Sequence, residues 1–495
     1  MSSPRAAGIL LHPTSLPGRF GIGDLGPGAH RWIEFLAAAG QKRWQVLPLT
    51  PTGYGDSPYQ SFSSFAGNPL LVSPEALYED GLLGAEDLER LPAFRPDRVD
   101  YGAVIPFKLD LLGRAYRRFR AGSAPTLVAP FEAFRARNAG WLEEFALFMA
   151  LKREAGGGAW TGWAVGVAGR SPAALEAARL RLESQCFEQC FHQFVFFRQW
   201  EALRQRARAA GVAMVGDLPI FVAHDSADVW ADPQLFDLDA HGAPARVAGV
   251  PPDYFSDTGQ RWGNPLYRWD RHRESGFAWW IARLGAALAL VDVVRIDHFR
   301  GFESCWEIPA DSKTAVTGRW APGPGAEFFE HVARVLGGLP LIAEDLGVVT
   351  PQVIALRDSL GLPGMKVLQF AFGDGPDHPF LPHRHVRNCV VYTGTHDNDT
   401  TRGWFGSAAE AERALARRVL ASDGREIAWD MVTAAFASVA DTAIVPLQDV
   451  LGLGSEARMN FPGRAAGNWA WRFTAEQLGA AVVDRLGALT ALHGR

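Results

Sequence analysis

The chain has 495 residues, 48% of them apolar and 21% charged, which supports a large hydrophobic core and excludes a disordered protein. The net charge of −5 comes without any block of basic residues, so a nucleic-acid or anionic-membrane partner has no electrostatic support. Four cysteines are too few for a disulfide framework, which predicts a reducing, cytoplasmic location.

Targeting and membrane segments are not expected. The first apolar run, residues 9–11, is too short for the core of a signal peptide. The longest apolar stretch, residues 277–290, contains Arg283 and predicts a buried helix better than a membrane span. The 17 tryptophans and 31 phenylalanines suit sugar faces as well as a core, and we expect most of them in the core.

Short apolar runs that end in polar residues alternate with segments of helical spacing, which is typical of β/α units. Eight such runs favour an α/β fold of the closed parallel type, a (β/α)8 TIM barrel. An open doubly wound sheet is the alternative, but no G-x-G-x-x-G fingerprint follows the first run. The predicted strands are Gly8–His12, Trp44–Leu49, Val212–Asp217, Val291–Asp297, Pro340–Glu344, Met365–Phe370, Cys389–Thr395 and Thr442–Gln448.

In such a barrel, catalytic groups lie at the carboxyl ends of the strands. Six polar side chains fall at or just beyond predicted strand ends and are expected to converge on one rim: His12, Asp217, Asp297, Glu344, Asp397 and Gln448.

Uneven spacing between the strands predicts insertions into a single catalytic domain, residues 1–495. Residues 51–190 follow the second strand and residues 221–269 the third, and both segments are longer than a crossover helix requires. Loops at this rim would wall a substrate groove. The last predicted strand is followed by too few residues for a C-terminal β-sandwich domain.

The segment Val291–Gly301, VDVVRIDHFRG, places Arg295 and Asp297 on one face of a strand. A guanidinium beside Asp297 would keep this carboxyl ionised, as a nucleophile requires. A structural ion pair is the alternative.

The segment Leu339–Gly347, LPLIAEDLG, brings Glu344 and Asp345 to the rim on opposite sides of a strand. We expect only one of them to face the cavity, with the raised pKa that suits a general acid. A helix cap or a rim salt bridge would use the same residues.

The segment Val390–Thr400, VVYTGTHDNDT, is rich in metal-ligand types, so a hard-cation site is an alternative there. The spacing matches neither HExxH nor an EF-hand, and no metal is predicted. Three carboxylates on one rim fit glycosyl transfer better: a nucleophile, an acid/base and a group that stabilises an oxocarbenium-like transition state.

Other residue clusters are weaker candidates for a functional site. Cys186, Cys190 and His192 lie in a helical pattern among phenylalanines and are expected in the core. Ser57 has no evident triad partners, so serine hydrolase chemistry has little support. Sequence alone leaves open whether five aromatic residues are sugar platforms or core: Tyr54, Tyr59, Tyr101, Trp262 and Phe370.

Taken together, these segments resemble the 4-α-glucanotransferases called amylomaltase or disproportionating enzyme, in the α-amylase-like clan. The resemblance covers nearly the whole chain, and the number and order of its motifs carry it. The motifs are LLHPTSLPG, GIGDLG, WQVLPLTPTGYGDSPYQSFSSFAGNPLL, GDLPIFVAHDSADVW, VPPDYFSDTGQRWGNPLY, VRIDHFRGFE, AEDLG, GTHDNDT and RMNFPG.

The resemblance implies Asp297 as the nucleophile, Glu344 as the acid/base and Asp397 as the carboxylate that holds sugar hydroxyls. It also implies an active-site loop at residues 250–262, no cofactor, and α-1,4-glucans and maltooligosaccharides as partners of a monomer or weak homo-oligomer. The substrate-binding residues would be Arg295, His298, His396, Asp217, Tyr59, Ser57, Gln260, Trp262, Tyr54 and Phe370. Cys305 and Arg464 depart from the family pattern and would affect acceptor affinity at most.

The implied reaction is a retaining double displacement in starch or glycogen metabolism, with carboxyls about 5–5.5 Å apart. Cycloamylose is a further product to expect. Three rivals remain: an amylase-type hydrolase that uses the same acids with water, a glucan-binding protein without turnover, and a metal-dependent hydrolase.

Overall fold

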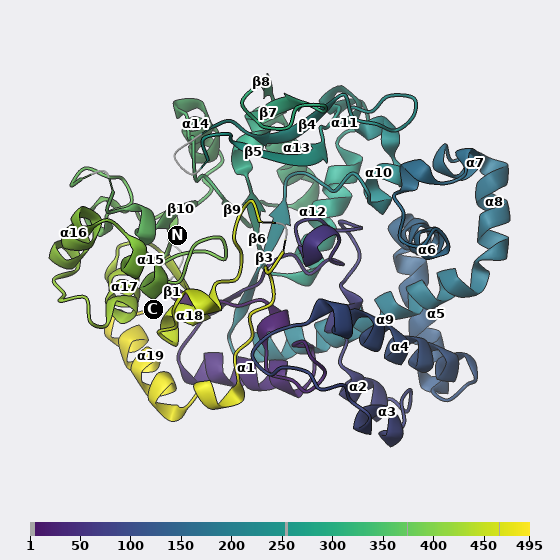
Figure 1. Ribbon diagram of the computed structural model, residues 1–495, viewed down its shortest axis with the longest axis horizontal. Helices are drawn as coiled ribbons and strands as arrows, with labels where there is room; N and C mark the ends of the chain where they lie inside the picture. Colours follow the sequence, from purple (N-terminus) through teal and green to yellow (C-terminus); the bar gives the residue numbers. More distant parts are fainter. Residues whose placement is uncertain (1–4, 253–255, 374, 465) are drawn as a thin grey trace.

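Eight parallel strands form the centre of the molecule (Figure 1). The structure is a computed structural model that describes residues 5–252, 256–373, 375–464 and 466–495. In chain order the central strands are β1 (Ala6–Leu10), β2 (Arg43–Gln45), β3 (Ala213–Pro219), β6 (Val293–Asp297), β9 (Leu341–Ala343), β10 (Gly364–Val367), β11 (Cys389–Tyr392) and β12 (Thr442–Pro446).

The eight strands follow each other in chain order around a barrel. Their order is β10-β11-β12-β1-β2-β3-β6-β9, and every pairing is parallel. The ring closes where the Ala343 amide donates to the Pro363 carbonyl at 2.9 Å, joining the start of β10 to β9. The predicted TIM barrel is therefore confirmed, as are all eight strands.

Most strands end earlier than the sequence indicates. The predicted strand Met365–Phe370 stops at Val367 and turns into the short helix η8 (Leu368–Phe370). The last predicted strand likewise stops at Pro446 and continues as a helix that contains Gln448. The apolar pattern continues past the ladder because these short helices are also buried.

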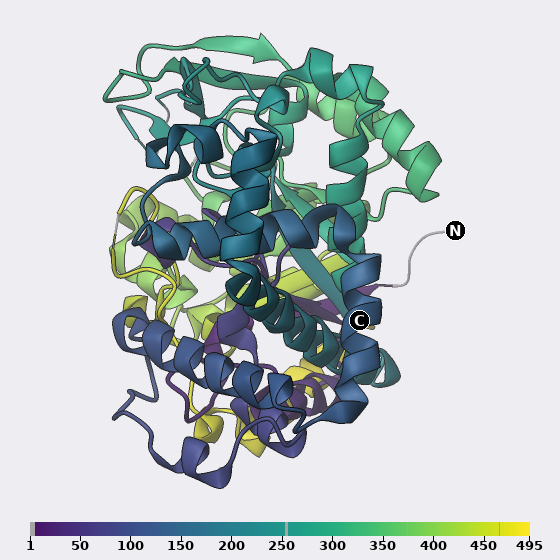
Figure 2. The same cartoon turned by 90° about the vertical axis from the view of Figure 1, so that its right-hand side faces the viewer.

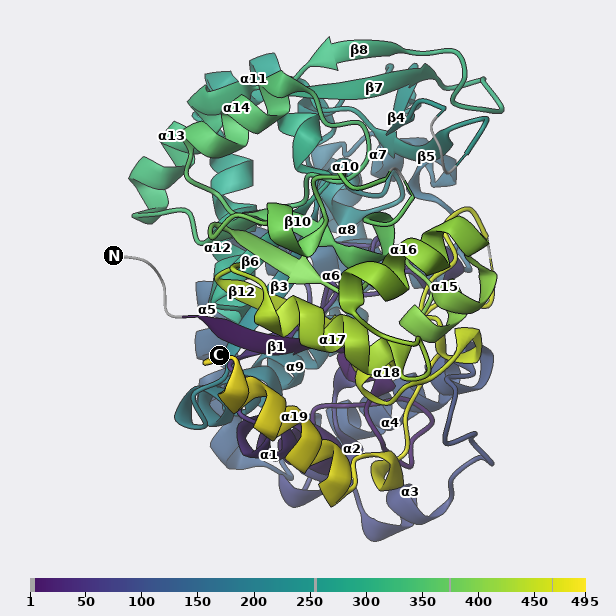
Figure 3. The same cartoon turned by 90° about the vertical axis from the view of Figure 1, so that its left-hand side faces the viewer.

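Helices cover the outside of the barrel and fill the long connections (Figures 1–3). They are α1 (Pro27–Ala38), α2 (Pro74–Glu79), α3 (Ala85–Glu89), α4 (Tyr101–Arg120), α5 (Val128–Arg137), α6 (Ala139–Glu154), α7 (Val165–Ala168), α8 (Pro172–Arg181), α9 (Glu183–Ala209), α10 (Ala227–Ala231), α11 (Trp269–Glu274), α12 (Ala278–Leu290), α13 (Gly325–Leu336), α14 (Pro351–Ser359), α15 (Thr401–Ser407), α16 (Glu410–Leu420), α17 (Ile427–Ala437), α18 (Leu447–Val450) and α19 (Ala480–Leu492).

The connection between β2 and β3, residues 46–212, folds into α2 to α9, which group together at the side of the barrel (Figure 2). Helix α9 buries an aromatic stripe, including Phe191 and Phe194, against α4, α5 and α6. Cys186, Cys190 and His192 lie buried in this packing and the two cysteines are free thiols, so the predicted core role is confirmed.

A second, antiparallel sheet lies at the top of the view in Figure 1. Its order is β5-β4-β7-β8, with strands β4 (Arg246–Val250), β5 (Gln260–Pro265), β7 (Ser304–Pro309) and β8 (Arg319–Pro322). The predicted insertion 221–269 supplies β4 and β5. The other two strands follow β6 and were not predicted from the sequence.

After β12 the described residues form only short helices and α19, which packs near α1 (Figure 3). They contain no C-terminal β-sandwich, as expected from the sequence. Across the residues that the structure describes, none of the helices has the length and apolar character to cross a bilayer.

Candidate active site

Strand register brings Asp217, Arg295 and Asp297 together. Asp217 on β3 stands opposite Arg295 on β6, and Asp297 lies two residues further along the same face of β6. Arg295 Nη1 donates to both Asp217 carboxylate oxygens at 2.8 Å, and Nη2 lies 2.9 Å from Asp297 Oδ1. Burial alone would lower the pKa of Arg295, but Asp217 and Asp297 raise it well above its ordinary value. This guanidinium is therefore a permanent positive charge beside Asp297.

Glu344 follows β9 at the level of Asp297, since Ile296 pairs with Ala343 in the ladder. Its Oε2 accepts from the His298 amide at 2.6 Å, and its Oε1 accepts from the Leu346 amide at 2.8 Å. The donor of the first bond is the residue directly after Asp297, so the two carboxyl groups are neighbours. Asp345 points the other way, where its carboxylate binds Arg357 and the Met365 amide.

The pKa of Glu344 differs strongly from that of an ordinary glutamate. Its pKa is raised to about 8, mainly because burial removes water from the carboxylate, and the charge of Asp297 acts in the same direction. Arg295 and the two backbone amides lower the pKa but only partly offset the burial. Glu344 is therefore protonated at neutral pH, next to a carboxylate that Arg295 keeps paired.

His298 has a left-handed backbone, with φ of 54°. The conformation is uncommon for a residue other than glycine, and the His298 amide is the donor to Glu344 described above. Its ring meets Trp262 edge-to-face at 4.8 Å between centroids. Burial lowers the pKa of His298 to about 4, so the ring is neutral.

A tight turn after β11 presents His396 and Asp397. Asn398 Oδ1 accepts from the amide and hydroxyl of Thr395 at 2.9 and 3.0 Å. Gly394 precedes this turn, where a Cβ would lie 2.6 Å from the Gln369 amide nitrogen. The turn leaves Asp397 half-exposed, with its Oδ2 3.4 Å from His396 Nε2.

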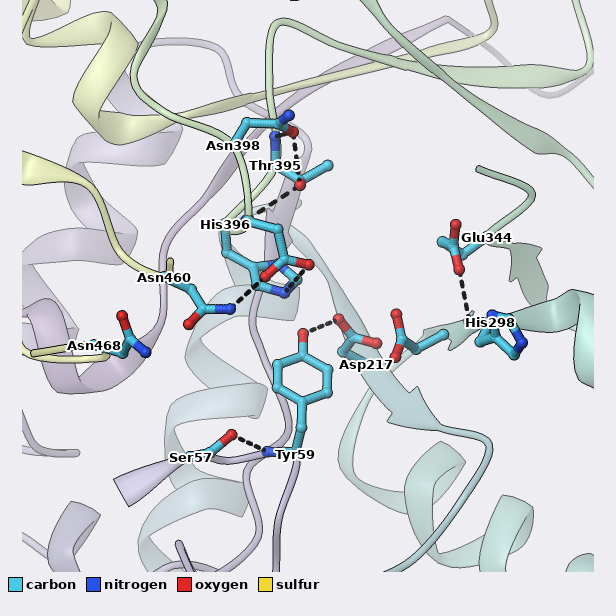
Figure 4. A network of polar contacts seen from close by, with 12 residues as sticks. Ser57, Tyr59, Asp217, His298, Glu344, Thr395, His396, Asn398, Asn460 and Asn468 are labelled. Atoms are coloured by element: carbon cyan, nitrogen blue, oxygen red, sulfur yellow. Dashed lines mark hydrogen bonds and ion pairs between the residues drawn. The ribbon is translucent and has the colours of Figure 1, made fainter. Parts of the chain in front are cut away.

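Tyr59 links the two sides of the site (Figure 4). Its hydroxyl donates to Asp217 Oδ2 at 2.8 Å, and its ring stacks on His396 at 5.1 Å. Burial, followed by the carboxylates of Asp217, Asp297 and Asp397, raises the pKa of Tyr59 well above its ordinary value. Asp297 and Asp397 thus both lie within electrostatic reach of one phenol.

Figure 4 shows Tyr59 and Asp217 between the Glu344–His298 pair and the His396–Asn460 pair. The structure thus places all three predicted acids around one region, together with five predicted substrate-binding residues. Those five are Tyr59, Asp217, Arg295, His298 and His396.

The remaining predicted residues lie around this centre or at its edge. Trp262 and Gln260 belong to β5, and the indole of Trp262 donates to Gln260 Oε1 at 3.2 Å. Ser57 Oγ accepts from the Tyr59 amide at 3.2 Å. Phe370 is half-buried at the end of η8, whereas Tyr54 is 78% exposed in the short helix η2 (Tyr54–Asp56). Part of the predicted active-site loop, residues 253–255, lies outside the described residues.

Two side chains of the RMNFPG segment support Asp397, although no role for them was predicted. Asn460 Nδ2 donates to Asp397 Oδ1 at 2.6 Å, and Arg458 Nη2 donates to the Asp397 carbonyl at 2.6 Å. Trp469 adds a third unpredicted contact, since its ring lies 5.6 Å from Tyr59. In the sequence, the only sign that the RMNFPG segment belongs to the site is that it is one of the motifs shared with the family.

The other two predicted rim residues, His12 and Gln448, are buried and line a small cavity together with His396. Gln448 also donates from α18 to the Ala457 carbonyl at 3.2 Å. Cys305, one of the two family departures, is a buried residue of β7. Arg464, the other, stacks on Phe461 at 4.4 Å.

Metal ligation has no geometric support in the part of the chain described here, where no three His, Cys, Asp or Glu side chains gather as a metal site would require. The rim of this barrel instead carries an ion-paired carboxylate next to a protonated one. This pair of groups is typical of enzymes that act on glycosidic bonds.

Comparison with known proteins gives the family. The family model described as 4-alpha-glucanotransferase matches residues 11–477, so the chain belongs to the 4-α-glucanotransferase family. It is 54% identical to the 4-alpha-glucanotransferase of Thermus thermophilus, over 99% of each chain. It is 45% identical to the chloroplastic/amyloplastic 4-alpha-glucanotransferase DPE1 of Arabidopsis thaliana, covering 100% of this chain and 86% of that one.

Solved structures agree with this assignment. The amylomaltase of Streptococcus agalactiae, solved in complex with acarbose, superimposes with a TM-score of 0.96 at 38% identity, over 99% of both chains. The amylomaltase of Corynebacterium glutamicum shares the fold with a TM-score of 0.80 at 19% identity, over 98% of this chain and 75% of that one.

Proposed function

We propose that this protein is a 4-α-glucanotransferase, which moves segments of an α-1,4-glucan to the 4-hydroxyl of a glucan or glucose acceptor. The observation that carries the proposal is the pair of unlike carboxyls: Asp297, paired with Arg295, and Glu344, with a pKa of about 8. Neighbouring carboxyls of this kind supply a nucleophile and a proton donor at the same pH.

In the first step, Glu344 protonates the glycosidic oxygen while Asp297 attacks the anomeric carbon. The C–O bond to the leaving fragment breaks, and a covalent glycosyl-enzyme forms with inverted configuration. Arg295 offsets the charge of Asp297 and orients its carboxylate. Asp397, held by Asn460, would bind sugar hydroxyls more tightly as the ring flattens toward the transition state.

In the second step, Glu344 is the base. It removes the proton from the acceptor 4-hydroxyl, whose oxygen attacks the anomeric carbon and releases Asp297, so that the α configuration is restored. Transfer exceeds hydrolysis when the acceptor is held and water is kept out. Trp262 on β5, Phe370 on η8, and Tyr59 stacked on His396 are the aromatic surfaces that would do this.

The proposal also includes the substrates, the role of the insertions, the cellular location and the oligomeric state. We assign α-1,4-glucans and maltooligosaccharides as substrates, with residues 51–190 and 221–269 as insertions that wall the groove of one catalytic domain. The acarbose complex of the Streptococcus agalactiae relative supports this ligand class. A cytoplasmic monomer or weak homo-oligomer fits the composition.

Incubation with maltotriose tests the activity directly. Transfer yields glucose together with chains longer than three units, and Asp297→Asn should abolish both. Asp311→Asn, which alters an exposed aspartate in the loop between β7 and β8, should behave as wild type. Glucose and maltose without any longer product would instead identify a hydrolase, and full activity of Asp297→Asn would refute the assigned nucleophile.

A further inference from the structure

One tryptophan has no place in the core or in the site described above. Trp320 on β8 is 38% exposed, whereas every other tryptophan among the described residues is buried or half-buried. Strand β8 is an edge strand of the antiparallel sheet, paired on one side with β7 only. A large ring on an open edge loses hydrophobic burial, so packing alone does not explain its position.

The ring of Trp320 is held in place from two sides. It stands directly opposite Trp306 in the ladder, and the two rings meet edge-on at 5.2 Å. The guanidinium of Arg300 lies 3.6 Å from the ring centroid and therefore covers one face. Arg300 is itself 5% exposed and donates to the Val348 carbonyl. The two contacts therefore hold the ring in one orientation, and the part of it that stays accessible is preorganised.

Trp320 is connected to the loops that carry Asp297 and Glu344. Arg300 belongs to η7 (Phe299–Phe302), which starts two residues after Asp297. Its acceptor Val348 lies four residues after Glu344. Arg300 thus connects Trp320 to the segments that follow both β6 and β9.

We propose that Trp320 is a stacking platform that binds a glucose unit of a long α-glucan outside the cleavage site. A flat ring that is held in one orientation and partly exposed suits the apolar face of a pyranose. Polar groups lie beside the ring, since the Arg300 guanidinium that covers it also donates to the Ser304 hydroxyl at 3.4 Å, and this hydroxyl donates to Glu303. This inference rests on the proposed function, because it takes the substrate to be an α-glucan.

A protein partner fits this surface less well. Stable protein interfaces bury roughly 1,200 Å² or more, and their centres are depleted of charge. The exposed indole is instead a single ring, and the next side chain along β8, Arg319, is charged and 65% exposed. A chain of sugars needs only one such ring per bound unit.

The test compares a long and a short substrate in Trp320→Ala, with Tyr78→Ala as the matched control. Tyr78 on α2 is also an exposed aromatic, at 46%. Loss of one stacked sugar should raise KM for soluble amylose about 3- to 10-fold. The kinetics with maltotriose should stay within about 2-fold, because all three of its units are engaged at the cleavage site. Trp320→Phe keeps a ring on the strand and should fall between the two, and it also answers the question if Trp320→Ala folds poorly.

A binding measurement separates this inference from the proposed function. Asp297→Asn should be retarded in native gels that contain amylose, and Asp297→Asn with Trp320→Ala should be retarded less. If wild type fails to disproportionate maltotriose, the proposed function is wrong whatever the gels show. If maltotriose is disproportionated but Trp320→Ala and Tyr78→Ala behave alike on amylose, the platform is refuted alone. Equal losses on amylose and maltotriose would also refute it, since they would indicate damage to the cleavage site.

Discussion

Replacing Glu344 with glutamine should change the pH dependence of stability as well as abolish catalysis. Burial raises the pKa of Glu344 from 4.5 to about 8. Between these values the folded protein holds a proton that the unfolded chain has released, so wild type loses stability as pH rises through this range. Glutamine does not titrate and should remove this loss.

The size of the effect follows from the pKa shift. Each pH unit in this window lowers the unfolding free energy by about 1.4 kcal/mol, which amounts to about 5 kcal/mol over the whole window. Between pH 5.5 and 8.5 the expected change is about 3 kcal/mol. The glutamine NH2 group cannot accept from the His298 or Leu346 amides, which costs about 1–3 kcal/mol. That penalty is independent of pH and cancels when the two conditions are compared.

Urea unfolding of wild type and Glu344→Gln at pH 5.5 and 8.5 measures the difference. The unfolding free energy of the variant relative to wild type should increase by about 3 kcal/mol between pH 5.5 and pH 8.5, because other groups titrate alike in both proteins. A stability difference that is the same at both pH values would show that Glu344 ionises normally in the folded protein. The assignment of Glu344 as a protonated acid at neutral pH would then be refuted.

Three further predictions concern activity. The kcat/KM for maltotriose should fall about tenfold per unit above pH 8 as Glu344 loses its proton, and a constant rate to pH 9.5 would contradict this. Tyr59→Phe loses the bond to Asp217 and should lower stability by about 1.5–3 kcal/mol and kcat/KM by about tenfold. Tyr116→Phe, which loses a bond to the Ser184 carbonyl in the insertion, should affect stability only, and equal kinetics of the two variants would count against a role for Tyr59. Dialysis against EDTA should leave the rate unchanged, and loss restored by a divalent cation would reinstate the metal-dependent alternative.

The barrel was predictable because its strands are apolar runs that end in polar residues. The same alternation placed Arg295 and Asp297 on one face of β6, where the structure joins them at 2.9 Å. It also sent Glu344 and Asp345 to opposite sides, and each has separate partners. Local periodicity fixes which side of a strand faces the barrel, and topology brings the strand ends together. The catalytic roles remain proposals.

Other features depend on contacts between distant segments. Nothing in the local pattern links Asn460 to Asp397, since their bond joins loops that follow different strands. Strands β7 and β8 are short and carry polar residues, and their pairing with β4 forms through a separate insertion. Most of the strands also end earlier than expected, because buried short helices and buried strands share the same apolar composition.

The connection between β2 and β3 shapes how this chain reaches its native state. Arg43–Gln45 pairs with Ala213–Val215 although about 170 residues lie between them. Closing a loop of that length instead of a crossover of about 20 residues costs roughly 2 kcal/mol more in chain entropy. Helices α2 to α9 shorten the effective loop once they pack on one another, so their collapse should precede the meeting of the two strands. The barrel is then expected to assemble late and slowly, because β2 and β3 can pair only after the segment between them has folded.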